Sequence, residues 1–524
     1  MIHTASSLRG MVTAPHHLAA QAGLDILKRG GTAAEAAVAV AATLAVVYPH
    51  MNSIGGDSFW IVREPDGRVH GVSACGAAAQ AATLDLYKGL SAVPWRGPLA
   101  ANTVAGTLSG WAALLRTVAD PLPLEALLEQ AIHYARNGVV VTKGGADIAV
   151  SKDAELKDQF GYADVFRPNN QSLKEGAILK QPALAQTLET LAVKGLNDFY
   201  EGGLAQAVAA DLSRAGSPVT AADLRAHAAT TPVPLTTAVR EAQLYNMTPP
   251  TQGFASLLIL ALYDRLGVSG HEHFDHLHGL VEATKQAFIL RDRHIGDPAF
   301  MDFDAQGLLS DKAALDALAA RIDRTRALPW PHVPQAGDTV WFGVIDEDGR
   351  AVSAIQSTYF EFGSGLVLPE TGIIWQNRGA SFRLSEGGWN ALKPGRKPFH
   401  TLNPALAVFD DGRVMSYGTM GGEGQPQTQA AVFSRYNAGM PLQQAITAPR
   451  WLLGKTWGEE SVSLKLEGRF DSGLIDALRN AGHQTEIVVD FTSMMGHAGA
   501  LVRHGDGRIE GASDPRSDGG VAAW

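Results

Sequence analysis

The sequence predicts a layered α/β protein in which strands stand on both sides of a helical middle. The first third alternates apolar helical stretches with glycine turns and then enters a strand at Ser58–Val62. The middle, from about Pro121 to Ala327, repeats apolar residues with the period of amphipathic helices. Beyond it the chain is strand-rich, and Asp-Gly pairs at 348–349, 411–412 and 506–507 mark hairpin turns.

The helices follow from caps and apolar spacing. Thr32 and Glu35 form a capping box that starts an Ala/Val-rich buried helix. This stretch is interrupted by Glu35 and is too short to cross a bilayer. The other helices predicted by their spacing are His17–Lys28, Leu124–Asn137, Pro182–Lys194, Leu204–Ala215 and His276–Arg291.

Composition excludes several classes of function. The 524 residues are 46% hydrophobic and 18% charged, as in ordinary globular proteins. A net charge of −10 gives no reason to expect a nucleic-acid or anionic membrane partner. Cys75 is the single cysteine, so no intrachain disulfide forms, and the first residues lack a signal peptide. We therefore expect a cytoplasmic protein whose partner is a small molecule.

The junction at Thr339 is the most informative point in the chain. A turn-like stretch, 334–338, meets a strand-like run, Val340–Ile345, and a second run follows at Ala351–Ile355. A threonine that opens such a strand can attack the preceding peptide bond, and the freed α-amine can then serve as base for the same hydroxyl. The alternative is a β-branched residue that merely starts a strand.

Three further stretches carry residues suited to binding or catalysis. The histidine-rich stretch His271–His278 has ligand types for zinc, but its spacing does not place the imidazoles on one helix face, so a polar helix entry is favoured and no metal is expected. Gly421 and Gly422 can turn backbone N–H groups toward an oxyanion. Arg378, after an apolar strand, is either a solvated strand-end charge or a clamp for an anion.

Several strings in the expected order resemble the γ-glutamyltranspeptidases and their acylase and amidohydrolase relatives over nearly the whole length. They are Gly10–Val12, Asp25–Ala33, Asn52–Gly56, Gly106–Gly110, Val281–Lys285 with Arg291-Asp292 and Gly296–Pro298, and Gly511–Arg516.

The resemblance implies a four-layer αββα sandwich of the N-terminal-nucleophile hydrolases, made as a precursor. Cleavage between Asp338 and Thr339 would give a large chain, 1–338, and a small chain, 339–524, that remain one folded unit. Thr339 aligns with the nucleophile, Ser357 with the hydroxyl that supports it, and Gly421 and Gly422 with the oxyanion pair. No cofactor is implied, and whether copies assemble into a homo-oligomer stays open.

The departures from the family lie in substrate recognition. Where the family grips a carboxylate with arginine, the stretch Ser73–Ala79 has no cation. Tyr359 replaces an asparagine, Ser381 an aspartate, and His400-Thr401 a serine pair, while Trp341 stands two residues after the nucleophile. Losing several charge-assisted contacts of about 1.5–3 kcal/mol each should abolish γ-glutamyl recognition.

What remains is one cation, Arg378, with aromatic bulk from Tyr359 and Trp341. That combination predicts a small acidic amide. It most resembles the pattern of family members that convert oxamate to oxalate and ammonia in purine breakdown. The alternatives are a γ-glutamyl hydrolase or transpeptidase, a cephalosporin-type acylase, and a non-catalytic relative that only binds a ligand.

Overall fold

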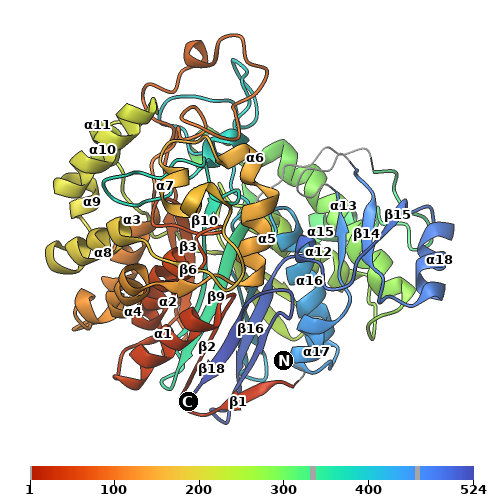
Figure 1. The fold of residues 1–524 in the computed structure, drawn as a ribbon. Coiled ribbons are helices and arrows are strands. Elements are labelled where there is room, and N and C mark those ends of the chain that lie inside the picture. The colour runs from red at the N-terminus through yellow and green to blue at the C-terminus, as the bar shows by residue number, and fades with distance from the viewer. Residues whose placement is uncertain (1–2, 331–337, 455–460) are drawn as a thin grey trace.

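The computed structural model describes residues 3–330, 338–454 and 461–524, and these form a four-layer αββα sandwich (Figure 1). Two mainly antiparallel sheets lie face to face, with helices over the outer face of each. The fold predicted from the sequence is confirmed. Among the described residues, no helix is long and apolar enough to cross a membrane.

One sheet has seven strands in the order β1-β17-β16-β12-β11-β8-β7, all neighbours antiparallel. Its strands are β1 (Ala5–Ser7), β7 (Leu235–Val239), β8 (Ala242–Asn246), β11 (Ala405–Phe409), β12 (Val414–Thr419), β16 (Ala498–Arg503) and β17 (Ile509–Ser513). The expected hairpins at 411–412 and 506–507 join β11 to β12 and β16 to β17.

The other sheet has six strands in the order β18-β2-β9-β10-β3-β4. They are β2 (Gly10–Ala14), β3 (Asp57–Arg63), β4 (Val69–Ala74), β9 (Asp338–Asp346), β10 (Ala351–Tyr359) and β18 (Gly520–Ala523). The predicted hairpin at 348–349 joins β9 to β10. The chain therefore places the strand that begins at residue 338 in the middle of this sheet.

Helices cover both outer faces. On the six-stranded sheet lie α1 (His17–Lys28), α2 (Ala33–Val47) and α3 (Thr107–Leu115), with α4 (Leu124–Asn137), α8 (Pro182–Lys194) and α10 (Gly203–Ala215) further out. On the seven-stranded sheet lie α12 (Gly253–Arg265), α16 (Gly424–Asn437) and α17 (Leu442–Thr447), with α13 (Phe274–His294) and α15 (Lys312–Ala319) packed on them. The capping box at Thr32 and Glu35 is present at the start of α2.

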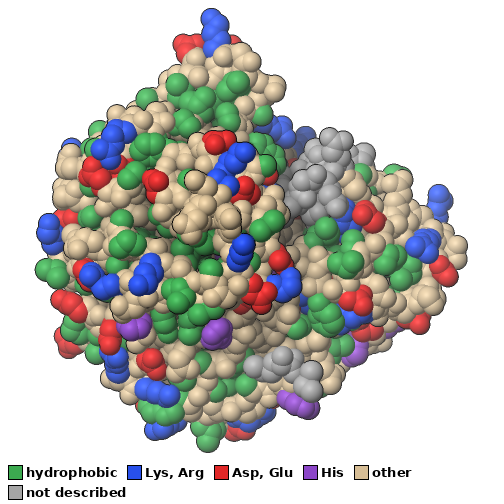
Figure 2. All heavy atoms as spheres, viewed as in Figure 1, with side chains coloured by type: hydrophobic (Ala, Val, Ile, Leu, Met, Phe, Trp, Pro, Cys, Tyr) green, Lys and Arg blue, Asp and Glu red, His purple; other side chains and the backbone are tan. Residues whose placement is uncertain are grey.

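The smaller elements lie at the periphery. Helices α5 (Lys143–Ser151), α6 (Asp153–Leu156), α7 (Tyr162–Phe166), α9 (Asp198–Glu201), α11 (Ala221–Arg225) and α14 (Ala305–Ser310) are short. A three-stranded sheet of β13 (Trp451–Leu453), β14 (Leu464–Glu467) and β15 (Thr485–Val488) with α18 (Ser472–Asn480), and the pair β5 (Val139–Val140) and β6 (Ile178–Leu179), complete the chain. On the face drawn in Figure 2, acidic and basic side chains are interspersed rather than gathered by sign.

Three hydrophobic cores correspond to the three interfaces between the four layers. Strand β9 contributes alternate side chains to two of them. Val340 and Phe342 join the core under α2, whereas Trp341 and Ile345 join the core between the sheets. This alternation is the period-two pattern of a strand that is buried on both faces. The odd-numbered face of β9, which includes residue 339, therefore points toward the other sheet.

Trp341 fills a space that only glycines in the opposite sheet leave open. A Cβ at Gly418 would lie 2.3 Å from the indole, and one at Gly499 would lie 2.5 Å from it. The indole nitrogen donates to Ser353 Oγ at 3.0 Å. The sequence analysis expected the Trp341 ring beside the substrate. The structure places it in the core between the two sheets instead.

We predict that Gly418→Ala lowers the free energy of unfolding by about 1–3 kcal/mol, because the added methyl overpacks the indole of Trp341. The midpoint of urea unfolding measures this. Gly387→Ala is the matched control, since a Cβ there meets nothing within 4 Å. An equal loss in both variants would contradict the packing argument.

Candidate active site

Thr339 is the second residue of β9 and is fully buried. Its neighbour strand β10 is irregular at this level: Gln356 pairs with Val340 and Tyr359 pairs with Asp338, with a shift of register between them. Ser357 lies in that irregular segment. A bulge re-aims side chains and is common beside active sites. Thr339 and Ser357 are thus placed at the one irregular point of the β9–β10 pairing.

Tyr359 ends β10 in an unusual conformation, with φ of 84°. A bulky residue in this region costs free energy and persists only where its surroundings impose it. Its N–H donates to Ser357 Oγ at 2.8 Å, which fixes both residues. The strained turn therefore sets the direction of the Tyr359 ring away from the regular strand.

Arg378 lies over that ring, with its guanidinium carbon 3.5 Å from the ring centroid. The preceding residue ties it to β10, because Asn377 N donates to Thr358 O at 3.1 Å. Arg378 is 1% exposed, so it is no solvated strand-end charge. Burial lowers the pKa of Arg378 to about 10, which leaves it charged at neutral pH.

In the described chain, the hydrogen-bond acceptors of this guanidinium are neutral. Nη1 donates to Phe399 O at 3.2 Å and Nη2 donates to Thr401 Oγ1 at 3.0 Å. The buried Nε has no partner in the part of the chain that the structure describes. Ser381 Oγ donates to the same carbonyl, Phe399 O, at 3.4 Å. The predicted substrate-binding residues Arg378, Tyr359, Ser381 and Thr401 are therefore brought together.

His400 joins this group through a residue that the sequence analysis did not single out. Its Nε2 lies 3.0 Å from Asp57 Oδ2, and both side chains are buried. Burial, and then the nearby Arg378, keep the pKa of His400 well below its usual value, so the imidazole is neutral. Its Nδ1 has no partner among the described residues.

Asp57 is the first residue of β3 and pairs with Ser357 across the sheet. Its Oδ1 accepts from Gly76 N at 3.1 Å, Gly106 N at 3.0 Å and Gln376 Nε2 at 3.2 Å. Burial raises the pKa of Asp57 to about 7, although the hydrogen-bond donors and the charge of Arg378 act to lower it. In the sequence, Asp57 follows Gly55-Gly56 directly and begins an apolar strand. An acidic residue in that position could have indicated a functional carboxylate.

Gly421 and Gly422 follow β12 with φ of 118° and 53°, a backbone that glycine adopts without strain. Their carbonyls are engaged: Gly421 O accepts from Gly424 N at 2.8 Å, and Gly422 O from Gln252 Nε2 at 2.8 Å. Neither N–H donates a hydrogen bond within the described residues. Two such amides are the donor set that an oxyanion requires.

Gln252 links the glycine pair to the predicted substrate-binding residues His400 and Thr401, and sequence reasoning did not identify it. Its Nε2 donates to Thr401 O at 2.7 Å as well as to Gly422 O, and its N–H donates to His400 O at 2.9 Å. Its Oε1 accepts from Arg291 Nη1 at 2.9 Å, and Arg291 Nη2 donates to Glu423 Oε1 at 3.2 Å. All are buried. One amide thus fixes the segments 400–401 and 421–422 relative to each other.

These residues meet at one end of the sandwich. Thr339, Tyr359 and Asp57 lie at the same end of the six-stranded sheet. At the seven-stranded sheet, residue 252 follows β8, residues 400–401 precede β11 and residues 421–422 follow β12, again at one end. The Asp57–His400 contact joins the two ends. A hydroxyl nucleophile, a pair of amide donors and a buried cation are the parts needed for acyl transfer from an anionic amide.

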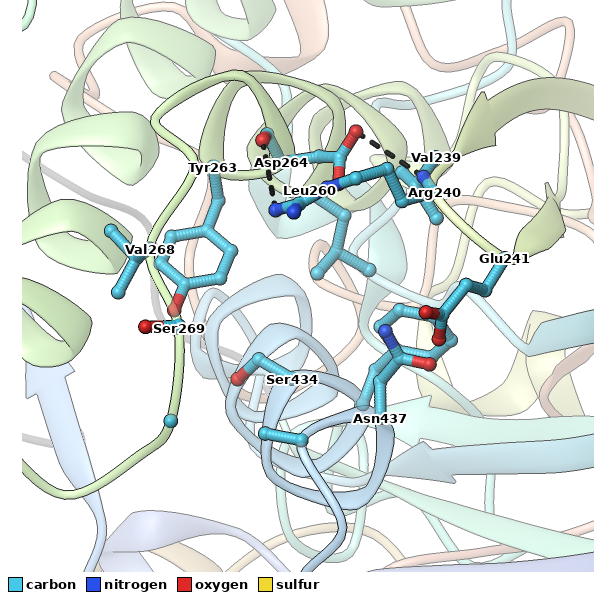
Figure 3. A pocket seen from close by; sticks show the side chains of 13 residues that line it. Val239, Arg240, Glu241, Leu260, Tyr263, Asp264, Val268, Ser269, Ser434 and Asn437 are labelled. Carbon is cyan, nitrogen blue, oxygen red and sulfur yellow. Dashed lines mark hydrogen bonds and ion pairs between the residues drawn. The ribbon is translucent and has the colours of Figure 1, made fainter.

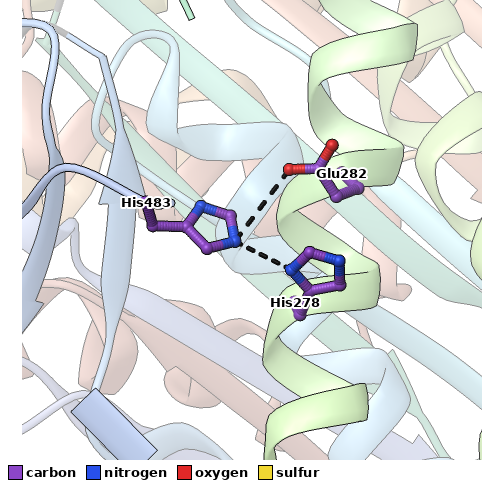
Figure 4. A group of neighbouring side chains, drawn as sticks. All are labelled: His278, Glu282 and His483. Carbon is purple, nitrogen blue, oxygen red and sulfur yellow. Dashed lines mark hydrogen bonds and ion pairs between the residues drawn. The ribbon is translucent and has the colours of Figure 1, made fainter. Parts of the chain in front are cut away.

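The histidine-rich stretch forms no common site, because its members have different partners. His273 Nε2 lies 2.9 Å from Ser269 O, and His276 Nε2 lies 3.0 Å from Ser434 Oγ. His278 joins Glu282 and His483, with ligand atoms within 4.8 Å of one another (Figure 4).

That trio is engaged with protein partners. His278 and His483 are hydrogen-bonded at 2.8 Å, and His278 Nε2 lies 2.8 Å from Asp323 O. Glu282 binds Lys285 at 2.6 Å and accepts from Leu328 N at 3.0 Å. The network holds the segment 323–328, which leads toward residue 339.

A cavity of about 260 Å³ lies elsewhere, between the β7–β8 turn and the C-terminal ends of α12 and α16 (Figure 3). Arg240 and Asp264 form an ion pair at its rim, with Nε and Oδ1 3.0 Å apart. Both helices begin beside the glycine pair. At 1.5 Å per residue the cavity is therefore about 20 Å from the candidate active site.

Comparison with known proteins identifies the family. A family model described as γ-glutamyltranspeptidase matches residues 19–524. The chain belongs to the γ-glutamyltranspeptidase family. An oxamate amidohydrolase proenzyme of Klebsiella pneumoniae is 52% identical over 99% of both chains, and a glutathione hydrolase-like proenzyme of Bacillus subtilis is 43% identical over 97% of both.

A solved structure supports the same assignment. Cephalosporin acylase from Bacillus halodurans superposes with a TM-score of 0.91 at 33% identity, covering 100% of this chain and 97% of that one. As a member of the γ-glutamyltranspeptidase family, the chain is an amide hydrolase with the N-terminal-nucleophile fold.

We predict that a small carboxylate inhibitor such as acetate binds more weakly as pH rises through about 7. Asp57 ionises there, so the pair Asp57–Arg378 changes from a net positive to a net neutral charge. At an effective dielectric of about 20 the added repulsion is of the order of 1–2 kcal/mol. The inhibition constant measured from pH 5.5 to 8.5 (roughly 1.5 units either side of that pKa) tests it.

The other titratable side chains around Asp57 in the described chain do not change charge in this range. His400 stays neutral, and burial raises the pKa of Cys75 to about 12 and that of Tyr200 higher still. In Asp57→Asn the part of the slope centred near pH 7 should be lost, and any slope that remains should follow the α-amine freed at residue 339, which titrates at about 7.7–8.0. An unchanged slope in this variant would assign the titration to another group.

Proposed function

We propose that the chain is a self-processing amidohydrolase that hydrolyses a small amide bearing a carboxylate, with oxamate as the substrate and oxalate and ammonia as products. The observation that carries the proposal is Arg378, a buried guanidinium with neutral partners and an unpaired Nε. A buried charge of this kind is stabilised by an anion in its site. The resemblance to the Klebsiella pneumoniae oxamate amidohydrolase proenzyme supports the choice of substrate.

In the proposed processing step, Thr339 Oγ1 attacks the carbonyl carbon of Asp338 and the peptide C–N bond breaks. The product is an ester between Asp338 and Thr339, which water hydrolyses to a carboxylate and a free hydroxyl. The step leaves a large chain, 1–338, a small chain, 339–524, and an α-amine on Thr339. Thr339 is fully buried in the intact chain, so we expect substrate to reach its hydroxyl only after this bond has opened.

In turnover, the α-amine takes the proton of Thr339 Oγ1 as the oxygen attacks the amide carbonyl. Gly421 and Gly422 N–H groups hold the oxyanion, and one such donor contributes about 10²–10³ in rate. The C–N bond breaks, and the proton passes to the leaving nitrogen, which departs as ammonia. Water, deprotonated by the same amine, then hydrolyses the acyl ester and restores the hydroxyl. Ser357, at the bulge, supports the amine and hydroxyl.

The substrate is expected to be compact because of the residues around Arg378. The Tyr359 ring lies directly against the guanidinium and fills the space on that side. Ser381 offers a neutral hydroxyl rather than an acid, so no acidic side chain directly contacts the guanidinium in the described chain. A cytoplasmic location and a role in purine breakdown, both expected from the sequence, remain predictions.

We predict that Thr339→Ala yields an intact chain that releases no ammonia, because the attacking oxygen is lost. Thr339→Ser keeps a hydroxyl and should be cleaved and active. Mass spectrometry of the purified proteins identifies the new N-terminus, and circular dichroism checks that the fold is kept. A cleaved, active alanine variant, or a wild-type chain that stays intact yet fully active, would overturn the assignment.

We predict that Arg378→Ala lowers kcat/KM for oxamate roughly ten- to hundred-fold, mostly through KM, because the lost charge-assisted contact is worth about 1.5–3 kcal/mol in both ground and transition states. Arg383→Ala, in the same segment but exposed, is the control. The ammonia-release assay should include glutaryl amides and γ-glutamyl-p-nitroanilide. Turnover of either that exceeds oxamate by orders of magnitude would favour an acylase or γ-glutamyl hydrolase; tight binding without turnover of any amide would favour a binding protein.

A further inference from the structure

The contact between Asp57 and His400 determines where the imidazole carries its proton. Above about pH 7 Asp57 is ionised. An ionised carboxylate only accepts hydrogen bonds, so Asp57 Oδ2, 3.0 Å from Nε2, then requires a proton on Nε2. A neutral imidazole carries one proton, and Nδ1 is therefore left with a lone pair. That atom is buried and has no donor among the residues that the structure describes.

A second unpaired atom of opposite kind lies in the same group. Arg378 Nε is a buried N–H without an acceptor in the described chain, and Arg378 Nη2 binds Thr401, the residue next to His400. The site thus offers one unsatisfied acceptor and one unsatisfied donor. Oxamate has the complementary pair, since its carboxylate accepts and its amide N–H donates.

We propose that Asp57 is a specificity-determining residue, which positions His400 with Nδ1 as a hydrogen-bond acceptor for the amide N–H of a substrate whose carboxylate binds Arg378. This inference rests on the proposed function and adds a reason for the choice of amide. Asp57 acts through His400 and does not touch the substrate.

The arrangement distinguishes substrate from product. Oxamate and oxalate have nearly the same size and differ in one group, an NH₂ in the amide and an oxygen in the acid. A lone pair at Nδ1 attracts the amide N–H and repels the carboxylate oxygen. Sites built to bind a donor reject an analogue that lacks it more strongly than apolar pockets reject a change of size. The same atom would therefore favour binding of the amide and release of the acid.

Asp57 is held so that it cannot turn away from His400. Its other oxygen accepts from Gly76 N, Gly106 N and Gln376 Nε2. The residue before it packs against β10, where a Cβ on Gly56 would lie 2.1 Å from Ser357 O. Two backbone N–H groups and one side-chain amide, from three segments, thus fix the carboxylate. A side chain with one oxygen at the Oδ1 position can still accept from all three.

The test is Asp57→Asn in the processed enzyme. The three donors keep the amide oxygen at the Oδ1 position, so the NH₂ group faces His400 and donates to Nε2. The proton then moves to Nδ1, and the acceptor becomes a donor. We expect kcat/KM for oxamate to fall about ten-fold or more and the inhibition constant of oxalate to fall as well. A purely structural role for Asp57 would weaken both ligands together, and that result would overturn the proposal.

His400→Gln provides a second, independent variant. Glutamine can still donate to Asp57 from the Nε2 position but has no acceptor at the Nδ1 position. We expect it to lose the preference for oxamate over oxalate. A wild-type ratio of oxamate KM to oxalate inhibition constant in His400→Gln would also overturn the proposal, even if Asp57→Asn fails to fold.

Failure of this inference can be separated from failure of the proposed function. If the wild-type enzyme hydrolyses oxamate but the variants keep the wild-type ratio of oxamate KM to oxalate inhibition constant, only the role of Asp57 is wrong. If the wild-type enzyme does not hydrolyse oxamate, the proposed substrate is wrong. The same variants are then tested with the amide that the enzyme does hydrolyse and with the matching acid as inhibitor.

Discussion

Arg378 carries its charge inside the protein, stacked on Tyr359 and bonded to neutral oxygens, and such a charge is costly unless something compensates it. The residues around Arg378 compensate part of the free-energy cost of burying its charge. The strained backbone of Tyr359 places an aromatic face under the guanidinium, and Asn377 fixes the segment to the end of β10. Asp57 is the carboxyl group whose charge acts on Arg378, and its Oδ2 is hydrogen-bonded to His400 rather than to the guanidinium. An anionic ligand would complete the balance.

The second constraint is mechanical. Thr339, the proposed nucleophile, lies on one sheet and the glycine pair on the other, and the proposed acyl transfer needs their positions to agree to a fraction of an ångström. A buried contact joins the sheets at this end, because Asp57 ties β3 to His400. Within the end of the seven-stranded sheet, Gln252 ties residues 400–401 to Gly422. Arg291, on α13, supports Gln252 from outside the sheet. The indole of Trp341, set between facing glycines, maintains the spacing of the two sheets just below the site.

Much of the fold and some of the site could be predicted from local patterns. The helix starting after Thr32, the hairpins at Asp-Gly pairs and the strand at Thr339 depend on neighbouring residues alone, and these predictions are confirmed. Arg378 was undecided, because burial of a strand-end residue depends on what packs over it. Asp57 and Gln252 were missed for a related reason: each acts through partners more than a hundred residues away, and neither has a motif of its own.

The sequence by itself determined the layers and the family, and it predicted the nucleophile, because period-two and period-3.6 patterns, turn residues and ordered motifs follow from neighbouring residues along the chain. Only the tertiary structure decided which polar atoms are left unpaired. Whether Arg378 Nε and His400 Nδ1 have partners depends on the simultaneous placement of strand ends from both sheets. Hydrogen bonds reach about 3 Å and are directional, so they are fixed by three-dimensional positions that no local pattern specifies.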